Sequence, residues 1–125
     1  MNLGTIHHVA IVVSDYEKSK DFYINKLGFE VLGEYPLANG DIRLDCKQGG
    51  SRLEIFWIKN APPKPEGVTY LGLRHLCFQA VDLEKQVEEL AAMGIETDGI
   101  RPDPKAPGRL TFFKDPDGLQ IELHE

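Results

Sequence analysis

The chain has 125 residues, of which 42% are hydrophobic, and this size and composition suit one ordinary domain with its own core. Its formal net charge of −6 and its isoelectric point near 5.2 argue against binding to nucleic acids or anionic membranes. The sequence shows no bilayer-length apolar run, no secretory signal pattern and only two cysteines, so we expect a cytoplasmic protein.

The first half of the chain predicts a strand, a helix and three further strands. A β-branched run indicates a strand at Ile6–Val13, and Ser14 or Asp15 is suited to cap a helix that ends near Leu27, before Gly28. Three more strands are expected at residues 29–35, 42–46 and 52–58, with Asn39-Gly40 as a hairpin turn between the first two. The order is β-α-β-β-β.

The second half predicts the same order of elements. Residues 60–69 contain three prolines and read as a linker between a module at 1–59 and a module at 70–125, within a single domain at 1–125. Beyond the linker we expect a strand at 72–80, a helix that begins at Asp82 and ends at Met93-Gly94, and strands at 95–101, 109–113 and 119–124. The last two strands flank a predicted type I turn at 115–118.

The two modules repeat at matching intervals. Asp15 follows His8 by seven positions, and Asp82 follows His75 by seven positions. The interval from His8 to Glu54 is 46 residues, and the interval from His75 to Glu122 is 47. Because each interval ends on the same residue type, an internal duplication is indicated. We therefore predict an α+β fold made of two tandem βαβββ modules with pseudo-twofold symmetry.

Four residues of this repeat stand on the same face of their strands. Side chains alternate along a strand, and the positions on the opposite face from His8, Glu54, His75 and Glu122 are all apolar. The apolar face is expected to pack under the helices. The face with His and Glu mixes polar and apolar residues, which is typical of a pocket wall.

Two imidazoles and two carboxylates form a mixed nitrogen and oxygen ligand set. Such a set suits Zn, Ni, Co, Mn or Fe(II) better than a soft thiolate site would. We therefore predict that His8, Glu54, His75 and Glu122 bind one divalent metal ion. Each histidine considered alone would more often be a structural residue, and the matched glutamates are what favour a metal site.

The sequence resembles the vicinal oxygen chelate superfamily, which includes glyoxalase I, bleomycin-resistance proteins and extradiol dioxygenases. The resemblance covers nearly the whole chain and is carried by four stretches, HHVAIVVSDYEKSKDFYINKLGFE, RLEIFW, LRHLCFQAVDLE and FFKDPDGLQIELHE. It implies paired βαβββ modules that form a cup-shaped mixed sheet with helices outside. The ligand order His, Glu, His, Glu is similar to that of glyoxalase I-like (lactoylglutathione lyase-like) members.

The resemblance also implies an activity. Its members bind two neighbouring substrate oxygens to a divalent metal, here Ni, Co, Zn or Mn, and stabilise an enediolate-like intermediate. By this resemblance Glu122, with help from Glu54, moves a proton between adjacent carbons. We expect a metal-dependent lyase or isomerase that acts on a small α-oxo compound or its thiol adduct. A homodimer is expected, and the metal site forms either within one chain or across two.

The surroundings of the predicted ligands suggest which substrates are accepted. Glutathione-dependent relatives carry an Arg four residues after the first ligand and an Asn four after the second, where this chain has Val12 and Ile58. Neither side chain binds a carboxylate or an amide, which argues against glutathione as the carrier. Phe56 and Cys77 are expected to line the substrate cup, and Arg109 is expected at its mouth, where it would hold a substrate anion.

Two other functions stay open at this point. One is a metal-free protein that sequesters an antibiotic or toxin, although the superfamily members of this kind typically lack the four ligands that are present here. The other is an Fe(II) extradiol-type dioxygenase, which the fourth ligand at Glu54 disfavours because that chemistry uses three protein ligands. Oxygen consumption with a catechol and iron would favour the dioxygenase.

Overall fold

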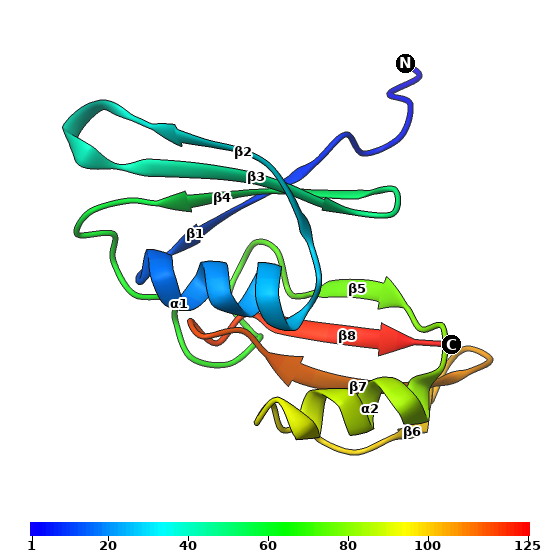
Figure 1. The fold of residues 1–125 in the computed structure, drawn as a ribbon. Helices are drawn as coiled ribbons and strands as arrows, with labels where there is room; N and C mark the ends of the chain where they lie inside the picture. The colour runs from blue at the N-terminus through cyan, green and yellow to red at the C-terminus, as the bar shows by residue number, and fades with distance from the viewer. The chain divides into compact units, whose positions relative to one another are not determined.

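A computed structural model describes all residues of the chain, Met1–Glu125, and divides it into two compact units. Unit 1 comprises Met1–Pro63 and unit 2 comprises Lys64–Glu125. Each unit contains one helical region and one four-stranded mixed sheet, which confirms the predicted α+β fold with two βαβββ modules (Figure 1). No helix combines the length and the apolar character needed to cross a bilayer.

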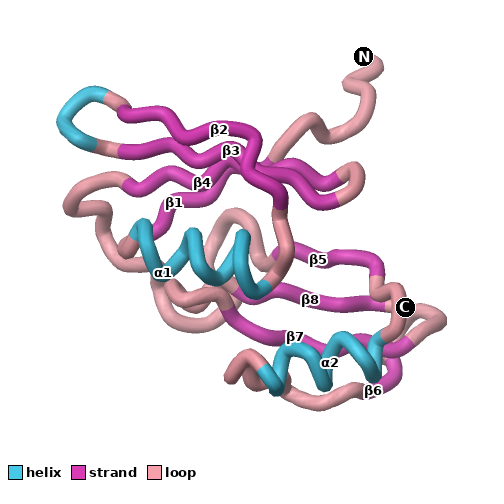
Figure 2. The backbone as a smooth tube through the Cα atoms, in the orientation of Figure 1, coloured by secondary structure: helices cyan, strands magenta, loops and turns pink.

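Unit 1 is built on a sheet with the strand order β1-β4-β3-β2. Strand β1 pairs with β4 in parallel, and the other pairs are antiparallel. Helix α1 continues directly into a π-helical segment, so the helical region is longer than α1 alone (Figure 2). The elements are β1 (Val9–Val13), α1 (Tyr16–Lys20), the π-helical segment (Asp21–Lys26), β2 (Glu30–Pro36), a short 3-10 turn (Ala38–Gly40), β3 (Ile42–Gln48) and β4 (Ser51–Trp57).

Unit 2 repeats this topology with the strand order β5-β8-β7-β6. Again the first strand of the unit pairs with the last in parallel, and the remaining pairs are antiparallel. The elements are β5 (Leu76–Gln79), α2 (Leu83–Ala92), β6 (Arg101–Pro102), β7 (Arg109–Lys114) and β8 (Gln120–His124). The structure therefore confirms the duplication that the sequence intervals predict.

One predicted strand is largely wrong. Residues 95–101 were expected to form a strand, but only Arg101–Pro102 pair with β7. Asp98 donates its backbone N–H to the carbonyl of Phe112, and its carboxylate accepts the N–H of Phe112 at 2.8 Å. The carboxylate thus takes the place of a backbone carbonyl, and Gly99 then adopts a left-handed φ of 93°. Together these features interrupt the strand before Arg101.

Both helices begin at an aspartate. The side chain of Asp15 accepts the backbone N–H of Lys18 at 3.0 Å, and that of Asp82 accepts the N–H of Lys85 at 3.1 Å. Each carboxylate satisfies an N–H group that has no partner within its helix and lies near the positive end of the helix dipole. The equal distance of these caps from His8 and His75 fixes where each strand ends and each helix starts.

Two turns agree with their sequence signals. Asn39 and Gly40 both have positive φ, as a type I′ hairpin requires, and join β2 to β3. In the turn before β8, Gly118 donates its N–H to the carbonyl of Asp115 at 3.0 Å. The buried carboxylate of Asp115 also accepts the N–H groups of Asp117 and Leu119, which holds the start of β8 in place.

The apolar face of each sheet forms the core of its unit. The twelve positions predicted to face the helices are all buried or half-buried. Helix α2 contributes Leu83 and Leu90 to the core of unit 2, and the helical region of unit 1 contributes Phe22 and Tyr23. Each helical region runs beside its own sheet in Figure 1. The face that carries His and Glu is the opposite one, which leaves it available for ligands.

The capping role of Asp82 predicts a specific loss of stability. Replacing Asp82 with Ala removes the acceptor for the Lys85 N–H and should lower the free energy of unfolding by about 1 kcal/mol. Asp82→Asn keeps an acceptor oxygen and should lose much less. Urea unfolding of the three proteins checks this, and equal losses in both variants would contradict the capping role.

Candidate metal and substrate site

Unit 1 brings the first predicted pair of ligands together. His8 directly precedes β1, and Glu54 lies on β4, where it pairs in register with Ala10. Because Ala10 is two residues after His8, both side chains point to the same face of the sheet. The Nε2 atom of His8 lies 3.5 Å from Oε2 of Glu54. Glu54 is only 7% exposed, so its carboxylate needs a polar or cationic partner.

Unit 2 builds the second pair with the same register. His75 directly precedes β5, and Glu122 on β8 pairs with Cys77, again two residues after the histidine. The Nε2 atom of His75 lies 2.8 Å from Oε2 of Glu122, and Glu122 is also 7% exposed. Each predicted His–Glu pair therefore forms within its unit. The four-residue site that would join the two pairs stays a prediction.

The donor atoms of these pairs fit a divalent metal ion. Within either unit no third His, Cys, Asp or Glu side chain joins a pair to complete a metal cluster. Each pair offers one imidazole nitrogen and one carboxylate, which are good ligands for borderline divalent metals. In unit 2 a neutral imidazole leaves the buried carboxylate of Glu122 without a full counter-charge, and a bound cation would supply that charge.

Glu54 has a second partner that the sequence patterns did not reveal. Nη2 of Arg43 donates to Oε1 of Glu54 at 2.7 Å, and the same guanidinium binds both oxygens of Asp45 at 2.7 and 2.9 Å. Nη2 of Arg52 donates to Asp45 at 3.2 Å. Asp45 is 3% exposed, and hydrogen bonds from Arg43 hold its pKa below the usual value although burial alone would raise it. The one hint in the sequence was Asp45 itself, because an aspartate within the predicted strand 42–46 needs a charged partner if it is buried.

Glu122 lacks such an arginine partner. The residue in register with Glu122 on β7 is Phe112, whereas the residue in register with Glu54 on β3 is Asp45. The ring of Phe112 meets the imidazole of His75 edge to face, with 5.2 Å between ring centroids. The two modules therefore place an ion network beside one glutamate and an aromatic ring beside the other.

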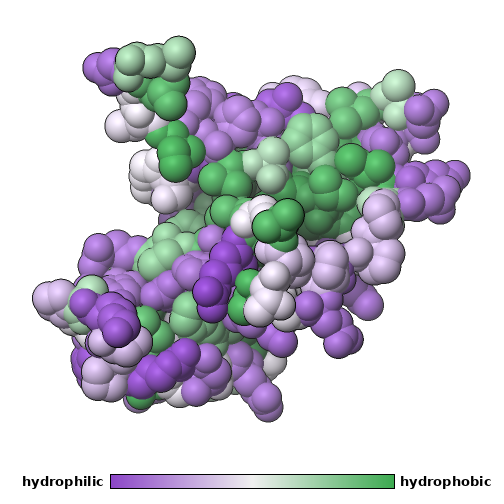
Figure 3. Space-filling view, turned by 180° about the vertical axis from the view of Figure 1, so that it is seen from behind, coloured by the Kyte–Doolittle hydropathy of each residue, from purple (hydrophilic) through white to green (hydrophobic).

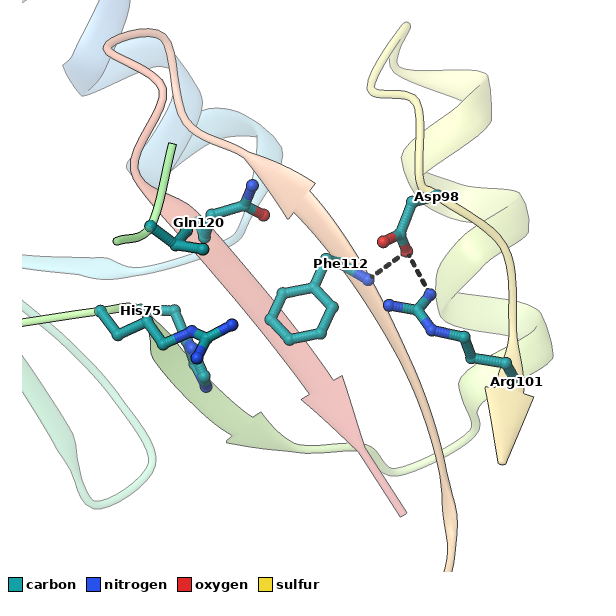
Figure 4. A pocket seen from close by; sticks show the side chains of 7 residues that line it. His75, Asp98, Arg101, Phe112 and Gln120 are labelled. Atoms are coloured by element: carbon teal, nitrogen blue, oxygen red, sulfur yellow. Dashed lines mark hydrogen bonds and ion pairs between the residues drawn. The ribbon is translucent and has the colours of Figure 1, made fainter. Parts of the chain in front are cut away.

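A pocket of about 190 Å³ lies in unit 2 next to this aromatic contact (Figure 4). Its wall includes His75, which is the one pocket residue that the sequence analysis identified. Figure 4 shows Asp98 and Arg101 joined by an ion pair on one side of Phe112 and His75 on the other. The lining residues are Val68, Arg74, His75, Asp98, Arg101, Phe112 and Gln120.

Phe56 and Cys77 lie on the face predicted for them. Phe56 is half-buried on β4, on the same face as Glu54, and the Arg43 guanidinium lies 5.8 Å from its ring centroid. Cys77 pairs in register with Glu122 on β8. Burial, together with the negative charge of Glu122, raises the pKa of the Cys77 thiol to about 11. The thiol is therefore protonated at neutral pH and is not an activated nucleophile.

Arg109 lies elsewhere than the predicted mouth of a substrate cup. Its guanidinium binds Glu84 on α2 and Glu125 at the end of the chain. Its neighbours of the same parity, Thr111 and Phe113, are buried on the helix side of the sheet. The structure thus gives no support to substrate binding by Arg109. Because side chains alternate along β7, the sequence could have predicted that Arg109 lies on the helix side of the sheet and Phe112 on the opposite side with Glu122.

The glutathione-binding positions of the resembling enzymes are apolar and exposed in unit 1. Val12 is 51% exposed and Ile58 is 37% exposed, and both have the parity of the His8 and Glu54 face. Figure 3 shows apolar side chains gathered on the part of the surface formed by the sheet of unit 1. The surroundings of His8 and Glu54 therefore suit an apolar group better than a charged peptide.

Comparison with known proteins identifies relatives over the whole chain. The family model described as Glyoxalase/Bleomycin resistance protein/Dioxygenase superfamily matches residues 5–123. The uncharacterised protein YwkD of Bacillus subtilis is 48% identical, over 100% of this chain and 99% of its own length. Human mitochondrial methylmalonyl-CoA epimerase is 27% identical, over 99% of this chain and 75% of its own length.

Solved structures agree with this result. A glyoxalase family protein from Enterococcus faecalis has a TM-score of 0.93 and 47% identity, with 100% of both chains covered. TnmS3, an antibiotic binding protein from a Streptomyces species, has a TM-score of 0.75 and 30% identity, over 99% of this chain and 97% of that chain.

The ion network around Asp45 predicts a change in acid stability. The pKa of Asp45 is lower in the folded protein than in the unfolded chain, where it is about 4. The ionised Asp45 therefore stabilises the folded state at pH values above about 4, and this stabilisation is lost as the pH falls through the pKa of the folded state. Asp45→Asn should cost about 2 kcal/mol at pH 7 and less at pH 3. Urea unfolding at both pH values measures the difference. A cost that does not change with pH would contradict the ionic role.

Proposed function

This chain belongs to the glyoxalase/bleomycin resistance/dioxygenase superfamily, and we propose that it is a metal-dependent, glyoxalase-like lyase or isomerase. The observation that supports this best is the presence of two His–Glu pairs with the same strand register, one in each unit. Two such pairs provide the four ligands of one metal site. Many members of the superfamily bind a divalent metal, bind small molecules and form dimers.

In the proposed site, His8 and Glu54 from one module and His75 and Glu122 from the other hold one Ni, Co, Zn or Mn ion. The two modules that share the ion belong either to one chain or to two chains of a homodimer. The ion would supply Lewis-acid stabilisation of negative charge on two neighbouring substrate oxygens. The apolar side chains near His8 and Glu54, such as Phe56 and Val12, would help to exclude water from the reacting carbons.

The two glutamates are suited to different roles. One oxygen of Glu54 accepts a charge-assisted hydrogen bond from Arg43, which holds this carboxylate in place. Glu122 is bonded through its side chain to His75 and faces Phe112, so it is freer to turn toward a substrate. We therefore assign to Glu122 the transfer of a proton between adjacent carbons of the substrate. Glu54 acts chiefly as a ligand.

The substrate in this proposal is a small α-oxo compound or its adduct with a thiol other than glutathione. The exposed Val12 and Ile58 side chains offer no donor for the carboxylates of a glutathione peptide. The epimerase relative gives support, since an epimerase inverts one carbon centre, and a proton transfer at that carbon does so. The absence of an activated thiol at Cys77 leaves the glutamates as the proton-transferring groups.

A second candidate function is binding of a small molecule without chemistry. The 30% identity to an antibiotic binding protein over nearly the full length of both chains favours it. In that function the apolar face of unit 1 would bind a hydrophobic molecule, and the buried glutamates would have only structural partners. Metal binding separates the two candidates.

The metal site predicts stoichiometric metal binding. Protein purified without chelator should contain one divalent metal per site, and His75→Ala should lower its affinity at least about 100-fold because a ligand is lost. His124→Ala is the matched control, since His124 lies on the neighbouring strand and bonds to Asp103. Mass spectrometric metal analysis and titration with Ni, Co, Zn and Mn provide the measurement.

Two results of this experiment would count against the enzyme. If the wild-type protein binds none of the four metals, the metal-dependent function is wrong and the small-molecule binder is favoured. If His124→Ala loses metal as strongly as His75→Ala, the ligand assignment is wrong.

The proposed role of Glu122 predicts loss of proton transfer. With methylglyoxal and a panel of thiols, the metal-loaded protein should form a 2-hydroxyacyl thioester faster with cysteine or coenzyme A than with glutathione. At equal metal content, Glu122→Gln should lower turnover about 100-fold or more, because an amide does not accept the proton. Glu54→Gln serves as the comparison and should lose less. Proton NMR follows the product, and full turnover in Glu122→Gln would remove Glu122 from this role.

A further inference from the structure

The pocket of unit 2 contains a guanidinium that is held in place on one edge only. We propose that Arg101 binds a carboxylate group of the substrate, so that a small 2-oxo or 2-hydroxy acid, or a thiol adduct that carries a carboxylate, is preferred over an uncharged compound. This inference rests on the proposed function in one respect, namely that the bound carboxylate belongs to a substrate. It assigns to Arg101, on β6, the selection of a negatively charged substrate over an uncharged one.

The hydrogen bonds of Arg101 leave one edge of the guanidinium free. Nη1 donates to Oδ1 of Asp98 at 2.9 Å and to the carbonyl of Gly99 at 3.1 Å. The Nε and Nη2 atoms donate to no group of the protein. A guanidinium that offers two parallel N–H groups matches the two oxygens of a carboxylate. Nη1 of Arg101 thus fixes the guanidinium to the protein, while Nε and Nη2 form the edge that can bind a ligand.

Asp98 acts as a positioning residue for this edge. Its Oδ1 atom accepts hydrogen bonds from Arg101, from the N–H of Phe112 and from the hydroxyl of Thr111. Burial would raise the pKa of Asp98, but the hydrogen bonds from Arg101 and Phe112 keep it below the usual value, so the carboxylate stays ionised. The same aspartate that interrupts the predicted strand at 95–101 therefore orients Arg101.

The ring of Phe112 further restricts the guanidinium. The Cζ atom of Arg101 lies 5.6 Å from the ring centroid of Phe112, within the range of a cation–π contact. The opposite neighbour of that ring is His75, the candidate metal ligand. Figure 4 shows Phe112 between Arg101 and His75. A substrate bound to Arg101 by its carboxylate would therefore extend along the ring toward His75.

The rest of the pocket wall adds donors and no competing acceptor charge. The side chains of Arg74 and Gln120 line the pocket and form no hydrogen bond or ion pair elsewhere in the protein. Asp98 is the one carboxylate in the wall, and its accessible charge is already shared with Arg101. Two arginines against one aspartate give the wall a positive charge in a chain whose net charge is −6. Such a wall favours an anion.

The size of the pocket limits the anion. A volume of about 190 Å³ lies below the range of drug-sized ligand sites. It suits a molecule with a handful of heavy atoms, such as a three- or four-carbon acid. A carboxylate and a phosphate can each place two oxygens in the plane of the two donors, so a direct comparison of pyruvate with inorganic phosphate decides which anion is bound.

The test is a binding measurement on the full chain stripped of metal with EDTA, so it does not depend on catalysis. Pyruvate, lactate, uncharged hydroxyacetone and inorganic phosphate are titrated into ¹⁵N-labelled protein, and the amide signals of Phe112 and Gln120 are followed. We expect saturable shifts with pyruvate and lactate, with a Kd on the order of millimolar, and weaker or no shifts with hydroxyacetone and phosphate.

Variants assign the effect to Arg101. Arg101→Gln should weaken pyruvate binding about tenfold, and Arg101→Lys should fall between that variant and the wild type, because lysine keeps the charge but lacks the fork. Lys85→Gln removes one positive charge from the exposed face of α2 and should leave binding unchanged. Unchanged amide spectra away from the pocket show that each variant is folded.

Three results would overturn the proposal. They are equal binding of hydroxyacetone and pyruvate, tighter binding of phosphate than of pyruvate, and full pyruvate affinity in Arg101→Gln. Failure of the metal site leaves these signals in place, since they are recorded without metal. Loss of carboxylate binding with intact metal binding would remove the acid substrate and keep the lyase or isomerase.

Discussion

The structure depends on burying one carboxylate beside one imidazole on the ligand face of each sheet. In both units the glutamate pairs in parallel register with the residue two places after the histidine, so His and Glu are diagonal neighbours. Parallel pairing of the first and last strands creates this geometry, and the aspartate cap seven residues after each histidine fixes the end of the first strand. A buried carboxylate without a cation is costly, and Glu122, unlike Glu54 with its Arg43 partner, has no arginine or lysine bonded to it, so its burial calls for a functional explanation.

Much of this arrangement was predictable because it is encoded in local spacing. His8, Asp15 and Glu54 recur as His75, Asp82 and Glu122, and this repeat predicts that the two modules have the same topology. The alternation of side chains along a strand predicts that each histidine and its glutamate share one face of the sheet. The fate of residues 95–101 was not predictable in this way. The Asp98 carboxylate accepts the N–H of Phe112, which is fourteen residues away in the chain. A local sequence pattern does not predict whether such a distant partner is reached or whether the side chain points to solvent. The same limit applies to Arg43 on β3, which donates a hydrogen bond to Glu54 on the neighbouring strand β4, eleven residues along the chain.

The duplication has diverged where the chemistry needs two different carboxylates. Asp45 and Phe112 occupy equivalent positions beside Glu54 and Glu122. In unit 1 this position belongs to an ion network that fixes the glutamate, and in unit 2 it belongs to a ring that contacts His75 and borders a pocket. A symmetric pair of ligands thus acquires asymmetric surroundings. Holding one glutamate and freeing the other is a simple way to obtain a ligand and a proton carrier from one repeated motif.

The same divergence explains why the positive charge of the pocket sits in unit 2. Phe112 offers no charged partner for a cation at this position, so Arg101 on β6 is anchored by Asp98 in the segment before that strand, and its guanidinium lies 5.6 Å from the ring centroid of Phe112. In unit 1 the position equivalent to Arg101 is Tyr35, and the nearby Arg43 donates its Nε and Nη2 hydrogens to Asp45 and Glu54. Proton transfer next to a carbonyl builds negative charge on the substrate. The guanidinium of Arg101, which is separated from His75 by the ring of Phe112, favours a substrate that is already negatively charged. Substrate selection and proton transfer would then share one sheet face, with the aromatic ring of Phe112 between them.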